Sequence, residues 1–339
     1  MKIYIIGCDQ MWATGVDEVH YRKVLRELGH QIVGNPIAAE AIVAVTWYHM
    51  IKWYWFLLKR AFPNKRFYAV LSSNPAFHPE YFEPIRKIAD EYIYFNTQQF
   101  EFLKAEGIEE SAMHYNPVYV DETIYSPVRL SKKDLAARLG LDYSRLKGRY
   151  VIGSLQRDSL GDELDKPKWQ KDPDLLLSVL QRLDQDKFVL LLGGPRRHYI
   201  IKQCQRLSIP YYYIGDESYV ISGRDDYHDG KNFLSKSETN LFYNLCDLYI
   251  VSSKSEGAPM AAVETALCKV PVIATRVGMA ADFLAPSMIY SSPQEAAELV
   301  TRCMEDPQFT EEVVGTTFQQ TIRVNNYGAL LERMGQIFQ

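Results

Sequence analysis

Two acidic residues flank a short polar turn that joins an apolar run to a helical pattern. Glu256 lies within the turn, and Glu264 follows after seven intervening residues. A carboxylate accepts hydrogen bonds from two hydroxyl groups well, so this pair could bind a ligand that carries hydroxyls at two separate places. The residues alone leave a second interpretation open, in which Glu256 is a charge at a helix start and Glu264 is a surface residue.

The helix that would carry Glu264 begins with a sequence that is suited to anion binding. Proline fits the first position of a helix, so Pro259 predicts the start. Backbone amides in a first turn have no partner within the helix and attract phosphate groups. Small or flexible residues allow a ligand to approach the backbone here: Gly257, Ala258, Met260 and Ala261. A nucleotide sugar, with a diphosphate between two hydroxylated groups, fits this arrangement.

Short β-branched runs alternate with helical patterns along the chain, which predicts an α/β protein with parallel sheets covered by helices on both faces. The predicted strands are 2–6, 31–33, 41–46, 66–71, 91–95, 150–155, 187–192, 211–214, 248–251 and 271–274. The predicted helices are 16–28, 50–61, 79–89, 97–106, 132–139, 174–183, 237–245, 259–267 and 330–337. A polar loop is predicted from 215 to about 236.

Prolines and a charged segment interrupt this alternation between residues 116 and 149. We therefore predict an N-terminal Rossmann-like domain, a linker, a C-terminal Rossmann-like domain and a final helix, over residues 1–128, 129–148, 149–315 and 316–339. Ligands in open α/β sheets bind at the carboxyl ends of the strands, so two such domains facing each other would form a deep cleft.

The segment 248–278 resembles the signature of the retaining family-four glycosyltransferases of the GT-B fold, which are glycosyl transferases of group 1. Their pattern is Ser-x-x-Glu-Gly-x-Pro, a second glutamate after seven residues, and then Ala-Cys-Gly-x-Pro-Val-Ile-Ala. This chain has Ser253 to Pro259, Glu264 and Cys268 to Thr275 at these places. Lys269 replaces the family's glycine after the helix, which predicts a helix end without the left-handed cap.

The resemblance implies two facing domains, a C-terminal helix that crosses back to the N-terminal domain, and sugar transfer from a nucleoside diphosphate sugar with retention. Glu256 would bind the donor sugar and Glu264 the ribose. In this family an arginine and a lysine hold the diphosphate, and Arg157 and Lys171 fit them, with Lys168 as the alternative lysine. Two cations can balance the diphosphate, so neither a metal nor a cofactor is expected. The same cations could also be solvated loop charges.

The N-terminal half resembles the family less closely. Gly15 falls where a glycine-rich loop normally faces the donor and the acceptor. The family's histidine on the acceptor side is replaced here, and the candidates for its place are Ser73, Asn74, His78 and His49. A lone histidine is more often structural. The sequence does not select UDP or GDP, the sugar or the acceptor, which could be a glycan, a lipid-linked molecule or a small molecule.

Two other functions stay open at this point. The first is a catalytically inactive module that binds a nucleotide sugar. It stays open because the family's histidine is missing and the first loop contains few glycines. Another GT-B enzyme, such as a nucleotide-sugar epimerase or a phosphorylase, is the second alternative, although the Ser-x-x-Glu-Gly-x-Pro segment argues against an epimerase.

An aromatic segment at residues 47–56 has two interpretations. Its aromatic side chains alternate with cations, so Trp47, Trp53 and Trp55 could contact a membrane face or a lipid-linked acceptor. The second interpretation, which we favour, is a buried helix of the N-terminal domain.

The composition is that of a globular protein, with 47% apolar and 24% charged residues. A net charge of −4, with the cations spread along the chain, argues against nucleic-acid binding. The five cysteines form no Cys-x-x-Cys pair: Cys8, Cys204, Cys246, Cys268 and Cys303. They predict reduced, buried thiols in a cytoplasmic protein, with the inner face of a membrane as a possible location if the aromatic segment is exposed.

Overall fold

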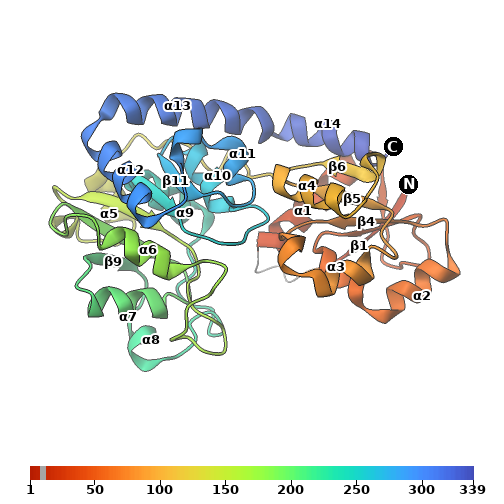
Figure 1. The fold of residues 1–339 in the computed structure, drawn as a ribbon, viewed down its shortest axis with the longest axis horizontal. Coiled ribbons are helices and arrows are strands. Elements are labelled where there is room, and N and C mark those ends of the chain that lie inside the picture. The colour runs from red at the N-terminus through yellow and green to blue at the C-terminus, as the bar shows by residue number, and fades with distance from the viewer. Residues whose placement is uncertain (8–12) are drawn as a thin grey trace. The chain divides into compact units, whose positions relative to one another are not determined.

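The computed structural model describes residues 1–7 and 13–339, with no side chain described for residues 13 and 14. The chain divides into two compact units (Figure 1). Unit 1 comprises Met1–Val120, Ser255–Met260 and Arg323–Gln339, and unit 2 comprises Asp121–Lys254 and Ala261–Ile322. Cys8 lies outside the described residues, and the other four cysteines are buried free thiols.

Unit 1 is built on a six-stranded parallel sheet with the order β2-β1-β3-β4-β5-β6. Its strands are β1 (Lys2–Ile6), β2 (Gln31–Ile32), β3 (Ala41–Ala44), β4 (Arg66–Val70), β5 (Glu91–Tyr94) and β6 (Met113–Tyr115). The chain reverses its direction across the sheet between β1 and β3, and such a switch point is where open α/β sheets bind ligands.

The helices of unit 1 are α1 (Ala13–Glu27), α2 (Trp53–Ala61), α3 (Pro79–Ile85), α4 (Thr97–Ala105) and α14 (Tyr327–Ile337). Short 3₁₀ turns are η1 (Trp47–Ile51), η2 (Pro75–Phe77) and η3 (Glu110–Ala112). The C-terminal α14 packs against α1. Just before α14, the side chain of Asn325 accepts from the Val120 amide and donates to the Val120 carbonyl, both at 2.8 Å. These bonds fasten the C-terminal segment to unit 1.

Unit 2 is built on a second six-stranded parallel sheet with the order β12-β11-β10-β7-β8-β9. Its strands are β7 (Tyr150–Ser154), β8 (Phe188–Gly193), β9 (Tyr211–Ile214), β10 (Leu248–Val251), β11 (Val272–Thr275) and β12 (Ile289–Tyr290). This is the strand order of a dinucleotide-binding Rossmann sheet, so its switch point lies between β7 and β10.

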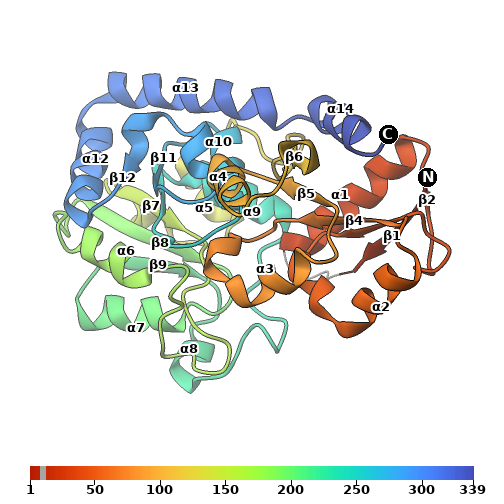
Figure 2. The same ribbon diagram turned by 45° about the vertical axis from the view of Figure 1, so that its right-hand side comes forward.

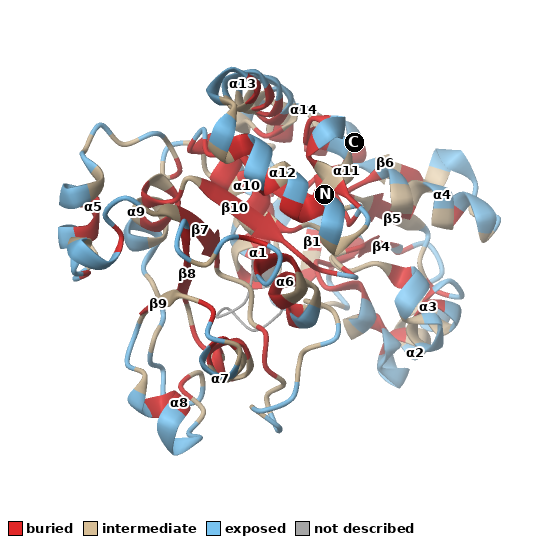
Figure 3. Cartoon of the chain, turned by 60° about the vertical axis from the view of Figure 1, so that its left-hand side comes forward, coloured by how far each residue is buried: buried red, intermediate tan, exposed pale blue. Residues whose placement is uncertain are grey.

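The remaining helices are α5 (Lys132–Arg138), α6 (Pro173–Leu180), α7 (His198–Arg206), α8 (Ser218–Ser222), α9 (Lys236–Leu245), α10 (Met260–Leu267), α11 (Ala280–Phe283), α12 (Pro293–Glu305) and α13 (Pro307–Val324). The turns η4 (Tyr143–Arg145) and η5 (Pro286–Met288) complete unit 2. Helix α6 packs against α7 and α12 (Figure 2). The central strands β3, β8 and β10 are buried throughout, and the helices turn an exposed face outward (Figure 3). Among the described residues, no helix is both long and apolar enough to span a bilayer.

Several predicted strands agree with the structure residue for residue, including β1, β9 and β10. The prediction of an uninterrupted polar loop after β9 is wrong, because α8 forms within it and ends at Gly223 in the left-handed conformation, with φ 67°. The sequence prediction also lacks β6, β12, α7, α11, α12 and α13. The short members of this group offer too few residues for a periodic pattern to be recognised.

Lys269, which follows α10, takes the left-handed conformation with φ 58°, so the prediction that lysine gives up this helix end is wrong. The Lys269 amide donates to the Ala266 carbonyl at 3.0 Å, and the Val270 amide donates to the Thr265 carbonyl at 3.3 Å. Lys269 Nζ lies 4.5 Å from the centre of the Phe318 ring. This cation–π contact offsets part of the conformational cost of about 1–2 kcal/mol.

Candidate functional site

The carboxyl ends of β7 and β10 meet at the switch point of unit 2. Gln156, which follows β7, donates to the Ile250 carbonyl of β10 at 3.3 Å and accepts from Ser253 Oγ at 3.4 Å. Arg157 is therefore the next residue of a segment that is hydrogen-bonded to the end of β10. In this fold class, the predicted place for a ligand is this edge of the sheet.

The turn that holds both lysine candidates is bonded to the same edge. The Lys168 amide donates to the Asp158 carbonyl at 2.7 Å, and Ser252 Oγ donates to the Lys171 carbonyl at 2.8 Å. The turn is closed by the Lys171 amide, which donates to the Lys168 carbonyl at 2.9 Å. The structure thus brings the chain segments of Arg157, Lys168 and Lys171 together, although the lysines lie 11 and 14 positions after the arginine in the sequence.

A buried ion pair lies directly behind this edge. Arg197 Nε donates to Asp158 Oδ2 at 2.5 Å, and Arg197 also donates to the Ser154 carbonyl at 2.7 Å. Both charged side chains are almost completely excluded from solvent. Burial raises the pKa of the Asp158 carboxyl, and the Arg197 guanidinium acts against that rise. The pair fixes the segment on which Arg157 lies, and the sequence analysis did not single it out.

Tyr227 is a second neighbour of Arg157 that the sequence analysis missed. Its ring centre lies 5.9 Å from the Arg157 guanidinium carbon and 4.6 Å from that of Arg196. Arg196 forms an ion pair with Asp225 at 2.7 Å, which fastens the loop that carries Tyr227. An aromatic residue in a polar, acidic loop was the available sequence signal, but Tyr227 lies 70 positions after Arg157 in the sequence.

Glu264 lies on α10 and is half-buried, so the interpretation of Glu264 as a simple surface residue is wrong. The Tyr243 hydroxyl donates to Glu264 Oε2 at 2.5 Å, and the Tyr125 side chain also hydrogen-bonds to the carboxylate. Burial raises the pKa of Glu264, and the two tyrosine hydrogen bonds act in the opposite direction.

The turn that contains Glu256 is counted in unit 1, with Ala258, Pro259 and Met260. Asn96 Nδ2 donates to the Gly257 carbonyl at 2.8 Å. A β-carbon on Gly257 would lie 2.4 Å from the Ser72 carbonyl oxygen, so only glycine permits this approach. Helix α10 begins at Met260, directly after Pro259, and Ala261 is the second residue of its first turn.

The acceptor-side candidates lie in two segments of unit 1, which are η1 and the stretch between β4 and α3. Ser73 accepts from Trp47 Nε1 at 3.0 Å, and Asn74 caps η2 through its side chain. His49 Nδ1 lies 3.2 Å from the Gly7 carbonyl oxygen, at the switch point between β1 and β3. His78 stacks on Tyr81 instead and lies 3.6 Å from Glu80.

Gly15 lies in the first turn of α1, and the prediction that it belongs to a loop is wrong. Asp17, two residues later, is buried, and this burial raises its pKa to about 7. The sequence analysis did not single out Asp17. Its spacing could have identified it, because Asp17 falls on the same helix face as the buried Tyr21 and Val24.

The aromatic segment is only partly buried, because Tyr48, Ile51, Trp53 and Tyr54 are exposed. Trp47 and Trp55 are 0% and 4% exposed, so for these two residues the interpretation as a membrane contact is wrong and the favoured interpretation as buried residues is confirmed. Their rings pack inside unit 1, where Trp47 contacts Phe82 and Trp55 contacts Tyr4. Trp53, at 71% exposed, is the one of the three that faces solvent.

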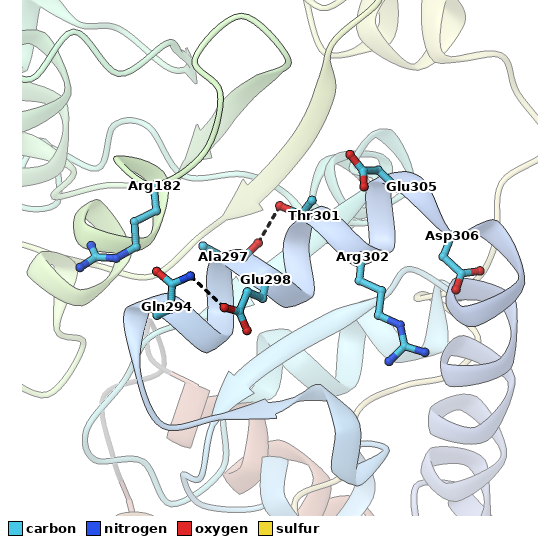
Figure 4. Close-up of a pocket in the computed structure, with 8 residues that line it drawn as sticks. All are labelled: Arg182, Gln294, Ala297, Glu298, Thr301, Arg302, Glu305 and Asp306. Carbon is cyan, nitrogen blue, oxygen red and sulfur yellow. Dashed lines mark hydrogen bonds between the residues drawn. The ribbon is translucent and has the colours of Figure 1, made fainter.

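An open groove of about 510 Å³ lies elsewhere on unit 2, along α12 (Figure 4). Its walls carry both signs of charge: Arg182, Gln294, Ala297, Glu298, Thr301, Arg302, Glu305 and Asp306. Within it, Gln294 donates to Glu298 at 2.8 Å. None of the predicted site residues lines this groove, so it is separate from the candidate site.

Comparison with known proteins gives one partial family match and several similar folds. Residues 167–317 match the family described as Glycosyl transferases group 1. A search of curated proteins gave no match. HepE of Anabaena, solved in complex with UDP and glucose, is similar with a TM-score of 0.73 and 12% identity, over 99% of this chain and 98% of HepE.

Two further solved structures are similar. Sucrose-phosphate synthase from Thermosynechococcus elongatus has a TM-score of 0.67 and 16% identity, over 98% of this chain and 79% of the synthase. A glycosyltransferase from Rickettsia africae has a TM-score of 0.67 and 13% identity, over 99% of this chain and 97% of the other. At these identities the likeness shows the fold, and it confirms the prediction of the GT-B fold with two Rossmann-like domains. The chain therefore has the GT-B fold, and its residues 167–317 are similar to the glycosyl transferases of group 1.

Proposed function

We propose that this protein transfers a sugar from a UDP-sugar to an acceptor, and that unit 2 binds the UDP part of the donor. The observation that carries the proposal is the unit 2 switch point, where hydrogen bonds join the segments of Arg157, Lys168 and Lys171. The group 1 match covers both lysines and Glu264. The HepE structure with UDP and glucose supports UDP as the nucleotide.

Each candidate residue has one function in this proposal. Arg157 and Lys171 bind the diphosphate, and Lys168 is the alternative to Lys171. Glu264 accepts hydrogen bonds from the ribose hydroxyls, while Glu256 accepts them from the hydroxyls of the donor sugar. The first-turn amides of α10 add donors for the phosphate oxygens.

Transfer breaks the bond between the anomeric carbon and the diphosphate oxygen. The acceptor hydroxyl forms its new bond on the same face of the sugar and gives its proton to the departing diphosphate oxygen, so the anomeric configuration is retained. Two cations at the diphosphate stabilise the charge that develops on the leaving group. Neither a metal ion nor a cofactor is part of this proposal.

The acceptor is proposed to bind on unit 1. His49 is the stronger of the two histidine candidates, because it lies at the switch point of this sheet beside Gly7. His78 is already engaged by Tyr81 and Glu80. Ser73 lies on a loop that Trp47 and Gln99 hold in place.

The direct test is an assay of purified protein with UDP- and GDP-sugars, with and without EDTA, in the presence of a panel of acceptors. We expect UDP release that EDTA does not change, and a product whose anomeric configuration, measured by NMR, equals that of the donor. An inverted product would contradict retention alone, and inhibition by EDTA would contradict metal independence alone. UDP binding without turnover would favour the inactive module, and conversion of the donor into its epimer would favour an epimerase.

A peripheral membrane contact through α2 is a second part of the proposal. Three residues on one side of this helix are exposed: Trp53, Tyr54 and Leu57. Lys52 and Arg60 are exposed beside them. These two cations give this face of α2 the charge that suits an anionic lipid surface.

Trp53→Ser should weaken binding to vesicles that contain anionic lipid. Burial of this side chain contributes about 1–2 kcal/mol, so partitioning should fall roughly five- to thirtyfold. Cosedimentation with anionic and neutral vesicles measures the change, and Trp169→Ser, which alters an exposed tryptophan of unit 2, is the matched control. Equal partitioning of the wild type and Trp53→Ser would contradict the contact.

A further inference from the structure

The carboxylate of Glu264 is held by two tyrosines from different segments of unit 2. Tyr243, on α9, donates its hydroxyl to Oε2 at 2.5 Å, which is within the short range of hydrogen bonds to an ionised carboxylate. Tyr125, from the chain before α5, bonds to the same carboxylate. Both tyrosines are buried, so neither bond competes strongly with water.

The two tyrosines are themselves fixed. The Tyr243 ring packs edge-on against Tyr249 of β10, with ring centres 5.5 Å apart and an angle of 76° between the planes. The segment after Tyr125 is tied to α9, since Asn244 Nδ2 donates to the Ser126 carbonyl at 3.0 Å. The Val128 amide donates in turn to Asn244 Oδ1 at 2.7 Å. The packing and hydrogen bonds of these two tyrosines therefore hold their hydroxyl groups in fixed positions beside the Glu264 carboxylate.

A carboxylate offers about four acceptor positions. The two phenolic hydroxyls occupy two of them, which leaves acceptor capacity for two more hydroxyl groups. The vicinal hydroxyls of a ribose present such a pair of donors. A carboxylate that is held from one side keeps its remaining lone pairs in a constant direction, and this lowers the entropic cost of ligand binding.

We propose that Tyr243 and Tyr125 are positioning residues, which orient Glu264 and keep it ionised so that it binds the 2′- and 3′-hydroxyls of the donor ribose. This inference rests on the proposed function, because it assigns a ribose to Glu264. It extends that function by naming two residues that act on the ligand only through Glu264.

Other titratable groups also face Glu264. Lys236 of α9 favours its ionised form, while Cys268 and Tyr249 are close enough to interact electrostatically. None of these replaces the lost hydroxyl when Tyr243 becomes phenylalanine. The hydrogen bond from Tyr243 lowers the pKa of Glu264, whereas burial raises it. Without this bond, the pKa of Glu264 therefore rises further. An ionised carboxylate should consequently persist only at higher pH in that variant.

The test compares the affinities of UDP and 2′-deoxy-UDP for the full-length protein across a range of pH. Tyr243→Phe should weaken UDP binding roughly three- to tenfold near neutral pH and weaken 2′-deoxy-UDP binding less. The pH below which UDP binding declines should also move upward. Tyr125→Phe should act in the same direction. Tyr150→Phe, which removes a hydroxyl bonded to the Asp247 carbonyl at the start of β7, is the matched control and should change neither affinity.

The wild type and Glu264→Gln, measured beside the tyrosine variants, separate failure of this inference from failure of the proposed function. If the wild type binds no UDP, the proposed function itself is contradicted. If Glu264→Gln loses the preference for UDP over 2′-deoxy-UDP while both tyrosine variants keep it, with an unchanged pH profile, only the positioning role is overturned. Equal losses for both nucleotides in Tyr243→Phe would show a general structural role and would also overturn it.

Discussion

Arg197→Met should destabilise the protein by about 3–5 kcal/mol, the largest effect on stability that we expect from a single change. Arg197 is 1% exposed and bonds to Asp158 Oδ2 at 2.5 Å and to the Ser154 carbonyl at 2.7 Å. Methionine fills a similar volume but leaves Asp158 as a buried charge without its cation. The free energy of unfolding, measured by denaturant titration and followed by tryptophan fluorescence, gives the change directly.

The pH dependence of this variant has a definite sign. Burial raises the pKa of Asp158 even with Arg197 present, and without Arg197 the folded-state pKa rises further above the unfolded value. At a pH below the pKa of Asp158 in the unfolded chain, this carboxyl is protonated in both the folded and the unfolded state. The loss of Arg197 then leaves no buried negative charge to destabilise the folded state. The penalty grows as pH rises through the window between the two pKa values. The loss in the free energy of unfolding of Arg197→Met, relative to the wild type, should therefore be smaller at pH 4 than at pH 7.

The double variant Asp158→Leu/Arg197→Met is the control, because it removes both charges. It should lose less stability than Arg197→Met alone, since no uncompensated charge remains. A loss below about 1 kcal/mol in Arg197→Met, or a larger loss in the double variant, would be inconsistent with a buried ion pair that fixes the edge of β7.

Arg157→Met should lower kcat for sugar transfer by roughly 10²- to 10³-fold, as expected when one preorganised donor to a developing charge is removed. The variant should also bind the product UDP more weakly, because the diphosphate loses a cation in the ground state as well. Steady-state kinetics with a UDP-sugar and an accepted acceptor measure both effects. Lys171→Met and Lys168→Met, assayed beside it, identify which lysine shares the diphosphate.

Arg182→Met is the matched control for this loss of charge. Arg182 is an exposed arginine of unit 2 that lines the groove along α12 (Figure 4), away from the switch point. Its kcat should stay within about twofold of the wild type. If Arg157→Met behaved in the same way, Arg157 would be a solvated loop charge and the diphosphate would need another partner.

The strands and the turn before α10 were predictable, because their signals are local. Apolar runs defined β7 to β11, and Pro259 placed the helix start within one residue of Met260. The resemblance also selected Arg157 and Lys171 before any geometry was available. These predictions depend on short stretches of sequence in which each residue type has a physical reason.

The partners of those residues were not predictable, because they are distant in the sequence. Tyr243 lies 21 residues before Glu264, and Asn96 lies 161 residues before Gly257. Arg197 reaches Asp158 across 39 residues. No periodic pattern encodes such pairings, which follow from the order of strands in each sheet.

The burial of the aromatic segment shows a similar limit. Trp47, Trp53 and Trp55 belong to one apolar run, and composition alone cannot say which of them face the core. The 3₁₀ turn η1 separates Trp47 from α2, so the helical phase is lost between the first tryptophan and the other two. Two of the three are consequently core residues, and the exposed one lies beside Tyr54 and Leu57.

The central claim is that the switch point of unit 2 binds a nucleoside diphosphate. Titration calorimetry of UDP with the wild type and with Arg157→Met tests this claim most directly, since it needs neither the sugar nor the acceptor. We expect one UDP bound per chain, with clearly lower affinity in the variant. Absence of UDP binding to the wild type, or equal affinity in the two proteins, would contradict the claim.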